Sequence, residues 1–396
     1  MTQGPRLVAY VGSYGCAPGA AGGGIYAFDA APDGSSLTQL SRVSEPKEAG
    51  YLVYAPQTRT LYAVDERKTD GRGPVEPPAA VHAFGVDGVT GELTLLNTQL
   101  APGPRPTFLD YDAVSRSLVC ANHGDFQHVE KVRCLPDGSW STEYVYDDST
   151  VLLYGLETDG SIGALRDLHV FEGQGKDPNF SPQNGGHAQS SPHAHCAVID
   201  PSGRFVLVCD KGTDRIHTFR LGDRLELVST LQMEPETGAR HVAFDPSGRL
   251  AFATLEFASE LAALAFDPET GAFTLLDRIS TIVTDPGRIN EPAEVRVHHH
   301  SGRIYVNNRG EDSLAWFAFE DGRLVWQGAV PLARSIHPGL AARSFTFDPT
   351  GSFVLVADRS AHVVRSYAVD ARTGALTWQT QAQVPDPAVI AFAQLW

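Results

Sequence analysis

The feature that most constrains the fold is a short pattern that recurs along the chain: an apolar stretch, a turn, and a second apolar stretch. Three copies carry the turn in its clearest form: CAVIDPSGRFVLVCDK (196–211), VAFDPSGRLAFATLE (242–256) and SFTFDPTGSFVLVADR (344–359). Looser copies are YLVYAPQTRTLYAVDE (51–66), FLDYDAVSRSLVCANH (108–123) and EVRVHHHSGRIYVNNR (294–309). Proline fixes φ in such a turn and glycine supplies its left-handed position. Each copy therefore predicts a β-hairpin.

Further strand-like pieces with alternating polarity follow each hairpin, as in ELAALAFDPETGAFTLLDRIS (260–280). Four strands repeated at a period of roughly 45 to 55 residues are typical of a propeller blade. The first unit, LVAYVGSYG (7–15), lacks its first strand, and the last segment, PAVIAFAQLW (387–396), is a spare strand. We therefore expect an all-β fold, a seven-bladed β-propeller closed by pairing of the N- and C-terminal strands, which leaves no open edge.

Two segments interrupt the period, at about 67–80 and about 125–192. They are rich in proline and glycine or irregular, although 150–156 and 160–170 still have the pattern of outer strands. Long loops of this kind often carry function, and we expect them to be lids over one face. The sequence predicts one domain, 1–396, with these two insertions.

Composition narrows the class of partner. The formal net charge of -16 argues against nucleic acid or an anionic membrane, since both need a basic surface. No apolar run reaches the length of about 18 residues that a membrane span needs, and no signal-peptide pattern is found. The five cysteines contain no C-x-x-C pair and are typical of reduced thiols. We expect a cytoplasmic protein with a small-molecule partner; the sequence does not indicate an oligomeric state.

Charged and polar residues recur at two positions of the aligned repeat. The position just beyond the second strand holds Ser13, Glu66, His123, Lys211, Glu256, Arg309 and Arg359. The position that opens the first strand holds Gly50, Thr107, His195, Arg240, Ala293 and Arg343. The first strand of each blade lines the central channel of a propeller. Both sets should therefore ring one mouth of that channel and form a binding site.

The residue types at this mouth suit a small anionic or polyhydroxylated substrate. Arginine binds carboxylate or phosphate with two parallel hydrogen bonds, and Glu256 and His195 can transfer protons near neutral pH. The chain has no local context for an acyl-enzyme serine or cysteine and no glycine-rich phosphate loop. His193 and His195, with His187 nearby, could ligate zinc. A loop leading into a blade is the favoured interpretation, so we predict neither metal nor cofactor.

Several motifs resemble the seven-bladed β-propeller lactonase family, which includes propeller-type 6-phosphogluconolactonases and carboxy-cis,cis-muconate lactonising enzymes. They are GGIYAFD (23–29), PHAHCAVIDPSGRF (192–205), GARHVAFDPSGR (238–249), PAEVRV (292–297) with YVNNRG (305–310), and RSFTFDPTG (343–351). The resemblance covers nearly the whole chain. It implies an active site of His195, Arg240, Glu256 and Arg309, and no metal or organic cofactor. Two features depart from the family: Leu255 replaces an asparagine, and the segment before His195 is long and polar.

The expected function is hydrolysis of a sugar or sugar-acid lactone. Arg240, Arg309 and Arg343 would hold an anionic group and stabilise the oxyanion, and Glu256 or His195 would activate water. The substrate-binding residues would be Arg343, Arg359, Lys211, His123 and Glu66. Two alternatives stay open: a cycloisomerase that forms a lactone from an unsaturated dicarboxylate, and a non-enzymatic interaction scaffold. The charged mouth argues against the scaffold, because binding a protein partner needs no convergent charge in the channel.

Overall fold

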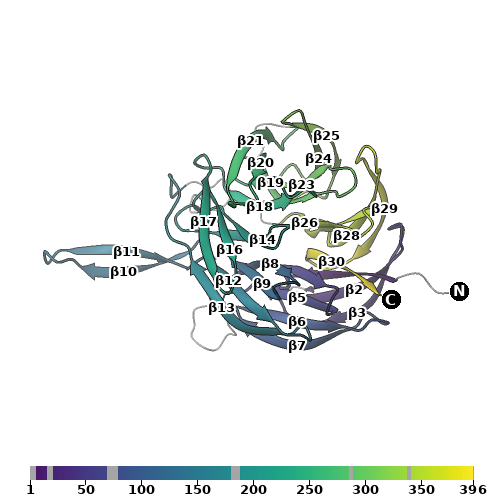
Figure 1. The fold of residues 1–396 in the computed structure, drawn as a ribbon, viewed down its shortest axis with the longest axis horizontal. Helices are drawn as coiled ribbons and strands as arrows, with labels where there is room; N and C mark the ends of the chain where they lie inside the picture. Colours follow the sequence, from purple (N-terminus) through teal and green to yellow (C-terminus); the bar gives the residue numbers. More distant parts are fainter. Residues whose placement is uncertain are drawn as a thin grey trace.

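The protein is a seven-bladed β-propeller, as the repeat predicted. The computed structural model describes residues 6–15, 21–68, 79–179, 188–284, 289–336 and 340–395. Seven four-stranded antiparallel sheets surround a central axis, and a separate two-stranded hairpin stands apart from them (Figure 1). Within the described ranges the one helical element is a 3-10 turn, Arg359–Ala361. None of the described residues forms a helix of the length and apolarity that crossing a membrane requires.

Each blade has four strands, named in order from the channel outward. Blade 1 consists of β30 (Pro387–Leu395), β1 (Arg6–Ser13), β2 (Gly24–Ala30) and β3 (Leu37–Val43). Blade 2 consists of β4 (Leu52–Ala55), β5 (Thr60–Asp65), β6 (Ala80–Val86) and β7 (Leu93–Leu100). Blade 3 consists of β8 (Pro106–Asp112), β9 (Ser117–Asn122), β12 (Thr150–Leu156) and β13 (Ile162–Val170). Blade 4 consists of β14 (Ala194–Ile199), β15 (Phe205–Asp210), β16 (Arg215–Leu221) and β17 (Leu225–Gln232).

The remaining blades follow the same order. Blade 5 consists of β18 (Ala239–Phe244), β19 (Leu250–Leu255), β20 (Glu260–Phe266) and β21 (Phe273–Ser280). Blade 6 consists of β22 (Glu291–Val297), β23 (Ile304–Arg309), β24 (Ser313–Glu320) and β25 (Arg323–Pro331). Blade 7 consists of β26 (Ser344–Phe347), β27 (Phe353–Asp358), β28 (Val363–Val369) and β29 (Leu376–Gln383).

The aspartate of each clear turn ties the hairpin together. In blade 4, the Asp200 carboxylate accepts hydrogen bonds from the backbone N–H groups of Arg204 and Phe205 at 2.8 and 2.7 Å. Gly203 has φ of 71°, a left-handed conformation that costs glycine little. Asp348 accepts the Phe353 N–H at 2.8 Å in the same way. The turns therefore fix the register of the two inner strands, which decides where each strand ends.

The two ends of the chain close the ring. β30 is the innermost strand of blade 1 and pairs antiparallel with β1, from Arg6 opposite Leu395 to Ser13 opposite Pro387. β1 and β30 lie side by side in this sheet (Figure 1). This pairing confirms the prediction that the last segment supplies the strand that the first blade lacks. Each of the seven blades thereby has four strands.

The core lies between neighbouring blades, on both faces of their second strands. Every residue of β5, β9, β15, β23 and β27 is buried. The fourth strands alternate or are mostly exposed, as in β7 and β17. The blades thus use a near-continuous apolar strand inside and an amphipathic strand at the rim, which is why the sequence pattern changes along each repeat.

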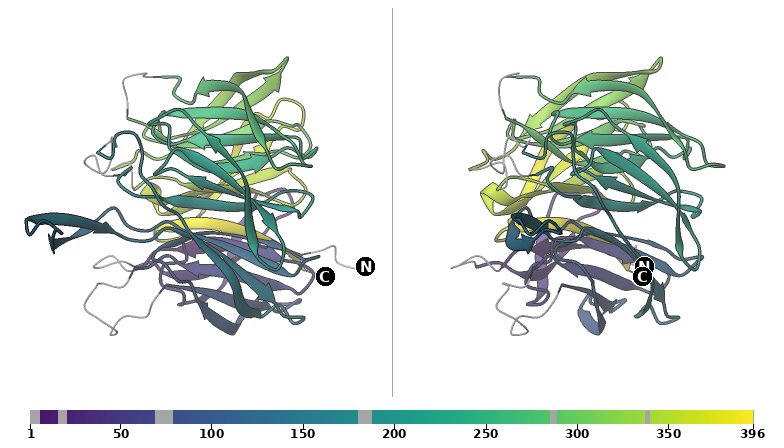
Figure 2. Two further views of the ribbon diagram at one scale, coloured as in Figure 1. Left: turned by 60° about the vertical axis from the view of Figure 1, so that its left-hand side comes forward. Right: turned by 90° about the vertical axis from the view of Figure 1, so that its left-hand side faces the viewer.

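The predicted insertions have different structures. Most of the first, about 67–80, cannot be compared with the prediction, because 69–78 lie outside the described residues. The second contains a hairpin of β10 (His128–Cys134) and β11 (Trp140–Tyr146), which projects from the body of the propeller (Figure 2). It then returns to β12 and β13, which are the outer strands of blade 3. The sequence predicted a largely irregular segment here, but the structure is mostly strand up to Val170. Residues 180–187 lie outside the described residues.

We predict that the closing strand contributes strongly to stability. Ile390 in the centre of β30 is buried, at 1% exposure. Truncating a buried isoleucine to alanine typically costs about 2 to 5 kcal/mol, so Ile390→Ala should lower the free energy of unfolding, measured with urea, by that amount. The control is Gln394→Ala, at an exposed position of the same strand; it should unfold like the parent. Equal stabilities of the two variants would contradict this role of the strand.

Candidate active site at one mouth of the channel

The starts of the inner strands and the ends of the second strands meet at one mouth of the channel, as the aligned repeat predicted. The hairpin geometry explains this, because antiparallel pairing sets Ala239 opposite Leu255 and Glu291 opposite Arg309. Residues about sixteen positions apart thus return to the same face. We call this face the charged mouth, defined by His123, His195, Lys211, Arg240, Glu256, Glu291 and Arg309.

The inner strands bulge where they reach the charged mouth. The strand register shifts between Pro106 and Phe108, Ala194 and Cys196, Ala239 and Val242, and Pro292 and Val295. A bulge re-aims the side chains next to it. Polar side chains of the second strands satisfy the freed backbone groups: Thr254 Oγ1 accepts the His241 N–H at 3.2 Å, and Asn307 Oδ1 accepts the Glu294 N–H at 2.8 Å.

Glu256 is the centre of the cluster. Its Oε1 lies 2.9 Å from Lys211 Nζ, and its Oε2 lies 2.7 Å from Arg240 Nε and 3.2 Å from Arg309 Nη2. All four side chains are buried. Burial alone would raise the pKa of Glu256, but Lys211, Arg309 and Arg240 together hold it well below its usual range. The carboxylate is therefore charged, and it binds three cations that would otherwise repel one another.

Glu291 is a member of the cluster that the aligned repeat missed. It begins β22, and its Oε2 lies 3.2 Å from Arg309 Nη2. Burial raises its pKa to about 7, with Arg309 opposing and the charge of Glu256 adding to the increase. The alignment assigned Ala293 to this place because the bulge between Pro292 and Val295 adds residues to the inner strand.

Three histidine rings lie together on the blade 3 and blade 4 side. His123 stacks on His193 with ring centroids 4.6 Å apart and meets the His195 ring edge-on at 5.3 Å. Burial, then the charges of Arg240 and neighbouring groups, lower the pKa of His195 well below its usual value, so its ring is neutral at pH 7. No group of three or more His, Cys, Asp or Glu side chains among the described residues is arranged to hold a metal ion. His187 lies outside the described residues.

The second insertion covers part of this mouth. The Phe126 ring lies 5.4 Å from Lys211 Nζ, measured to its centroid, and packs on His193 at 4.6 Å between centroids. Gln189 donates its side-chain N–H to the Lys211 carbonyl oxygen at 3.1 Å. Both ends of the insertion therefore contact the charged cluster. Whether the insertion opens and closes as a lid stays a prediction.

The other predicted residues form a second group around Tyr14, across blades 1, 2 and 7. The Tyr14 hydroxyl donates to Glu66 Oε2 at 2.6 Å and accepts a hydrogen bond from Arg343. Arg359 lies over the Tyr14 ring, 4.6 Å from its centroid. Gly50 makes room for Glu66, because a Cβ there would lie 2.1 Å from the carboxylate. Tyr14 was not predicted, since its repeat position is one residue beyond the aligned set.

The two groups belong to one electrostatic environment. Burial and the charge of Arg309 lower the pKa of Arg240 to about 10, and Arg343 adds to this effect. Arg240 therefore stays protonated at pH 7. The structure places all nine predicted site residues at this mouth, five of them (His195, Lys211, Arg240, Glu256 and Arg309) in the charged cluster, with His123 stacked beside it and Glu66, Arg343 and Arg359 around Tyr14.

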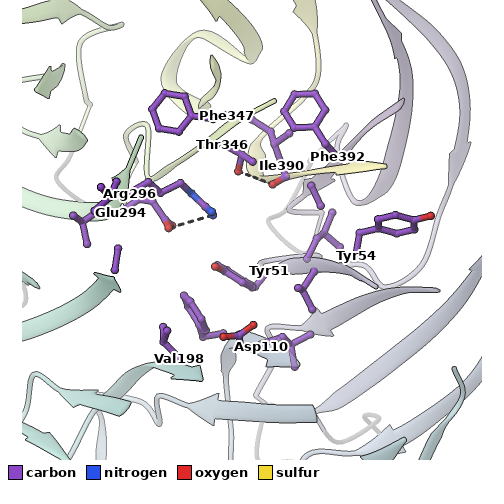
Figure 3. A pocket seen from close by; sticks show the side chains of 18 of the residues that line it. Tyr51, Tyr54, Asp110, Val198, Glu294, Arg296, Thr346, Phe347, Ile390 and Phe392 are labelled. Atoms are coloured by element: carbon purple, nitrogen blue, oxygen red, sulfur yellow. Dashed lines mark hydrogen bonds and ion pairs between the residues drawn. The ribbon is translucent and has the colours of Figure 1, made fainter. Parts of the chain in front are cut away.

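A cavity of about 580 Å³ lies elsewhere, in the half of the channel nearer the hairpin turns (Figure 3). Its lining includes Tyr51, Asp110, Glu294 and Arg296, with many apolar and aromatic side chains. The Arg296 guanidinium is already bound, by Glu294 at 3.3 Å and by the Phe345 carbonyl oxygen at 2.7 Å. The converging cations and histidines lie at the other mouth, and we therefore consider the charged mouth to be the candidate active site.

The fold is a seven-bladed propeller, and buried cations and histidines converge at one mouth of its channel. Comparisons with known proteins identify the family. The model of the family described as lactonase, seven-bladed β-propeller, matches residues 8–392. The 6-phosphogluconolactonase of Bacillus subtilis (strain 168) is 26% identical over 392 residues, which cover 98% of each chain. The chain belongs to the seven-bladed β-propeller lactonase family.

Solved structures agree with this fold. The periplasmic gluconolactonase PpgL of Pseudomonas aeruginosa superposes with a TM-score of 0.80 at 23% identity, covering 99% of both chains. A protein from Lactobacillus plantarum superposes with a TM-score of 0.79 at 26% identity, covering 98% of this chain and 99% of that one. At these identities the likeness to PpgL shows the common fold, and the roles of individual residues rest on the geometry above.

We predict that Glu256 is needed for stability as well as for the site. Removing one partner of a buried ion pair leaves uncompensated charge and typically costs about 3 to 5 kcal/mol. Glu256→Gln should lower the free energy of unfolding in urea by about that much, since three buried cations lose their counter-charge. Glu269→Gln is the matched control, because Glu269 pairs with Arg204 at the exposed surface; it should leave stability unchanged. A Glu256→Gln variant as stable as the parent would contradict this role of Glu256 as the counter-charge of the three cations.

Proposed function

We propose that the protein hydrolyses the lactone of a sugar acid at the charged mouth, with the cations there binding an anionic group of the substrate. The observation that carries the proposal is the cluster of Lys211, Arg240 and Arg309 on one buried carboxylate. Among the described residues, Nη1 of Arg240 is buried without a hydrogen-bond partner, so it is available to a ligand oxygen. Membership of a lactonase family supports the class of reaction.

His195 is the proposed base. Glu256, the other candidate from the sequence, has both carboxylate oxygens engaged by Lys211, Arg240 and Arg309, so its role is to hold these cations. The imidazole of His195 is neutral, and its Nδ1 is occupied by His241 at 3.1 Å. No hydrogen bond to its Nε2 is found within the described part of the chain, which leaves that nitrogen free to accept a proton from water.

The reaction then follows from these positions. Water loses a proton to His195 Nε2 and attacks the lactone carbonyl carbon, forming a new carbon–oxygen bond. The oxyanion accepts hydrogen bonds from the Arg240 guanidinium, which is held in place by Glu256. Collapse of the intermediate breaks the bond between the acyl carbon and the ring oxygen. His195 returns its proton to that oxygen, and the product is an open-chain hydroxy acid.

The group around Tyr14 is the proposed site for a substrate phosphate. Arg343 and Arg359 both lie at Tyr14, and Nε of Arg343 is buried without a hydrogen bond to any described residue. The two guanidinium groups lie 5.4 and 4.6 Å from the centroid of the same ring, and a pair of guanidinium groups suits a phosphate. The Bacillus subtilis relative is named for a phosphorylated lactone, and the cationic mouth supports the same preference here.

Acid release from two lactones tests the function and the substrate class together. We predict turnover of 6-phosphogluconolactone with a lower KM than gluconolactone. Arg343→Met should raise KM for the phosphorylated lactone by about tenfold or more, because one charged hydrogen-bonding partner is lost, and change KM for gluconolactone little. Arg249→Met, on the hairpin turn of blade 5, is the control and should alter neither value. Equal effects of Arg343→Met on both lactones would refute the phosphate site.

We also predict that the pH profile of kcat/KM has an alkaline limb, and that this limb arises from Glu291. Its pKa is raised to about 7 by burial, so it loses its proton as pH rises through that value. The new negative charge beside Glu256 should weaken binding of an anionic lactone, and kcat/KM should fall. In Glu291→Gln this limb should disappear after correction for spontaneous hydrolysis. An unchanged alkaline limb in the variant would exclude Glu291 as its origin.

The cycloisomerase alternative uses the same arginines as carboxylate clamps and stays a prediction. Loss of ultraviolet absorbance from a carboxymuconate, without acid release from either lactone, would favour it over hydrolysis. The scaffold alternative requires that neither assay shows turnover. Cytoplasmic location also stays a prediction, and cell fractionation tests it.

A further inference from the structure

A chain of three side chains leads from the candidate base into the channel. His195 Nδ1 lies 3.1 Å from His241 Nε2. His241 Nδ1 lies 3.4 Å from Glu294 Oε2, an ion-pair contact, and makes no hydrogen bond to any described residue. Glu294 Oε1 in turn lies 3.3 Å from Arg296 Nη2 (Figure 3). All three members, His195, His241 and Glu294, are buried.

The charges of the groups favour one arrangement of the protons. An ionised carboxylate only accepts, and Arg296 keeps Glu294 ionised, so the carboxylate favours the His241 tautomer with its proton on Nδ1. A neutral His241 then accepts at Nε2, and the proton between the two rings belongs to His195 Nδ1. His195 is left with an unprotonated Nε2. This tautomer is the one that a base facing the mouth needs.

The bulge in β18 makes the arrangement possible. Arg240 and His241 are neighbours in sequence, yet Arg240 binds Glu256 at the mouth and His241 contacts His195 and Glu294 in the channel. The register shift between Ala239 and Val242 allows both side chains to lie on the channel side of the blade. The backbone N–H of His241 is bound by Thr254 Oγ1, which fixes the position of the ring.

We propose that His241 and Glu294 are positioning residues that hold His195 in its Nδ1-protonated tautomer and stabilise it when it takes a proton at Nε2. This proposal rests on the proposed function for its kinetic consequence, but its tautomer assignment stands on the contacts alone. The surroundings of His195 contain further charged and titratable groups on every neighbouring blade: His123, His193, Lys211, Arg240, Glu256 and Arg296. The cations among them disfavour a protonated His195, which is why a carboxylate behind His241 matters.

Nitrogen-15 NMR of the histidine rings is the first test. In the wild-type protein at pH 7, the His195 signals, assigned by their loss in His195→Gln, should show a protonated Nδ1 and a bare Nε2. In Glu294→Gln the neutral amide no longer favours one tautomer of His241, so a population of His195 with a protonated Nε2 should appear. A wild-type His195 protonated at Nε2 would overturn the proposal, and this readout does not depend on any substrate.

Kinetics with the preferred lactone are the second test. Glu294→Gln should lower kcat by about tenfold or more, leave KM within about threefold, and shift the acid limb of kcat/KM to lower pH, because the carboxylate no longer stabilises the protonated pair. His217→Gln is the matched control: its ring is also buried and bound to Thr230 at 3.1 Å, but lies on β16 away from the channel. An unmoved acid limb in Glu294→Gln would overturn the proposal.

The two tests separate the proposal from the function that it serves. If His195 has the expected tautomer but no lactone is hydrolysed, the positioning pair stands and the proposed reaction is wrong. If lactones are hydrolysed but His195 carries its proton on Nε2, lactone hydrolysis stands, and both the positioning pair and the assignment of Nε2 as the base are wrong.

Discussion

Antiparallel pairing of the first two strands in every blade is the constraint on which fold and site both depend. A tight turn of fixed register sends the chain along the channel and back, so that residues opening one strand meet residues ending the next. Repeated around the ring, this geometry produces a buried second strand in each blade and one mouth where all these ends converge. The candidate site residues sit at the strand ends of this scaffold, an arrangement that suits catalysis.

The charged mouth illustrates the energetic cost of such convergence. Lys211, Arg240 and Arg309 are buried together, which is unfavourable unless a counter-charge is present. Glu256 supplies it, and Glu291 adds a second carboxylate whose raised pKa keeps it near its titration point. Under the proposed function, a substrate anion would enter a site that already holds its cations in place, which would reduce the ordering needed on binding.

Much of this could be predicted from the sequence because it depends on repetition. The turn motifs set the register, and the register identified the positions of His195, Arg240, Glu256 and Arg309. The strand that closes the ring followed from an unpaired first unit. The resemblance to the lactonase family pointed to the same four residues, and the family is confirmed over residues 8–392.

Other features of the site could not be predicted, because they depend on departures from the repeat. Glu291 and His241 stand at bulges, where the inner strand gains residues and an alignment on the turn no longer tells which side chain faces the mouth. Tyr14 lies just after its strand, and its contacts with Glu66 and Arg343 join blades distant in sequence.

A crystal structure with the open-chain product, 6-phosphogluconate, bound would test the assignment of the active site better than any single variant. We predict its carboxylate at Arg240 beside His195 Nε2 and its phosphate near Arg343 and Arg359. Binding instead in the turn-side cavity, against Arg296 and Asp110, would contradict the assignment of the charged mouth as the active site.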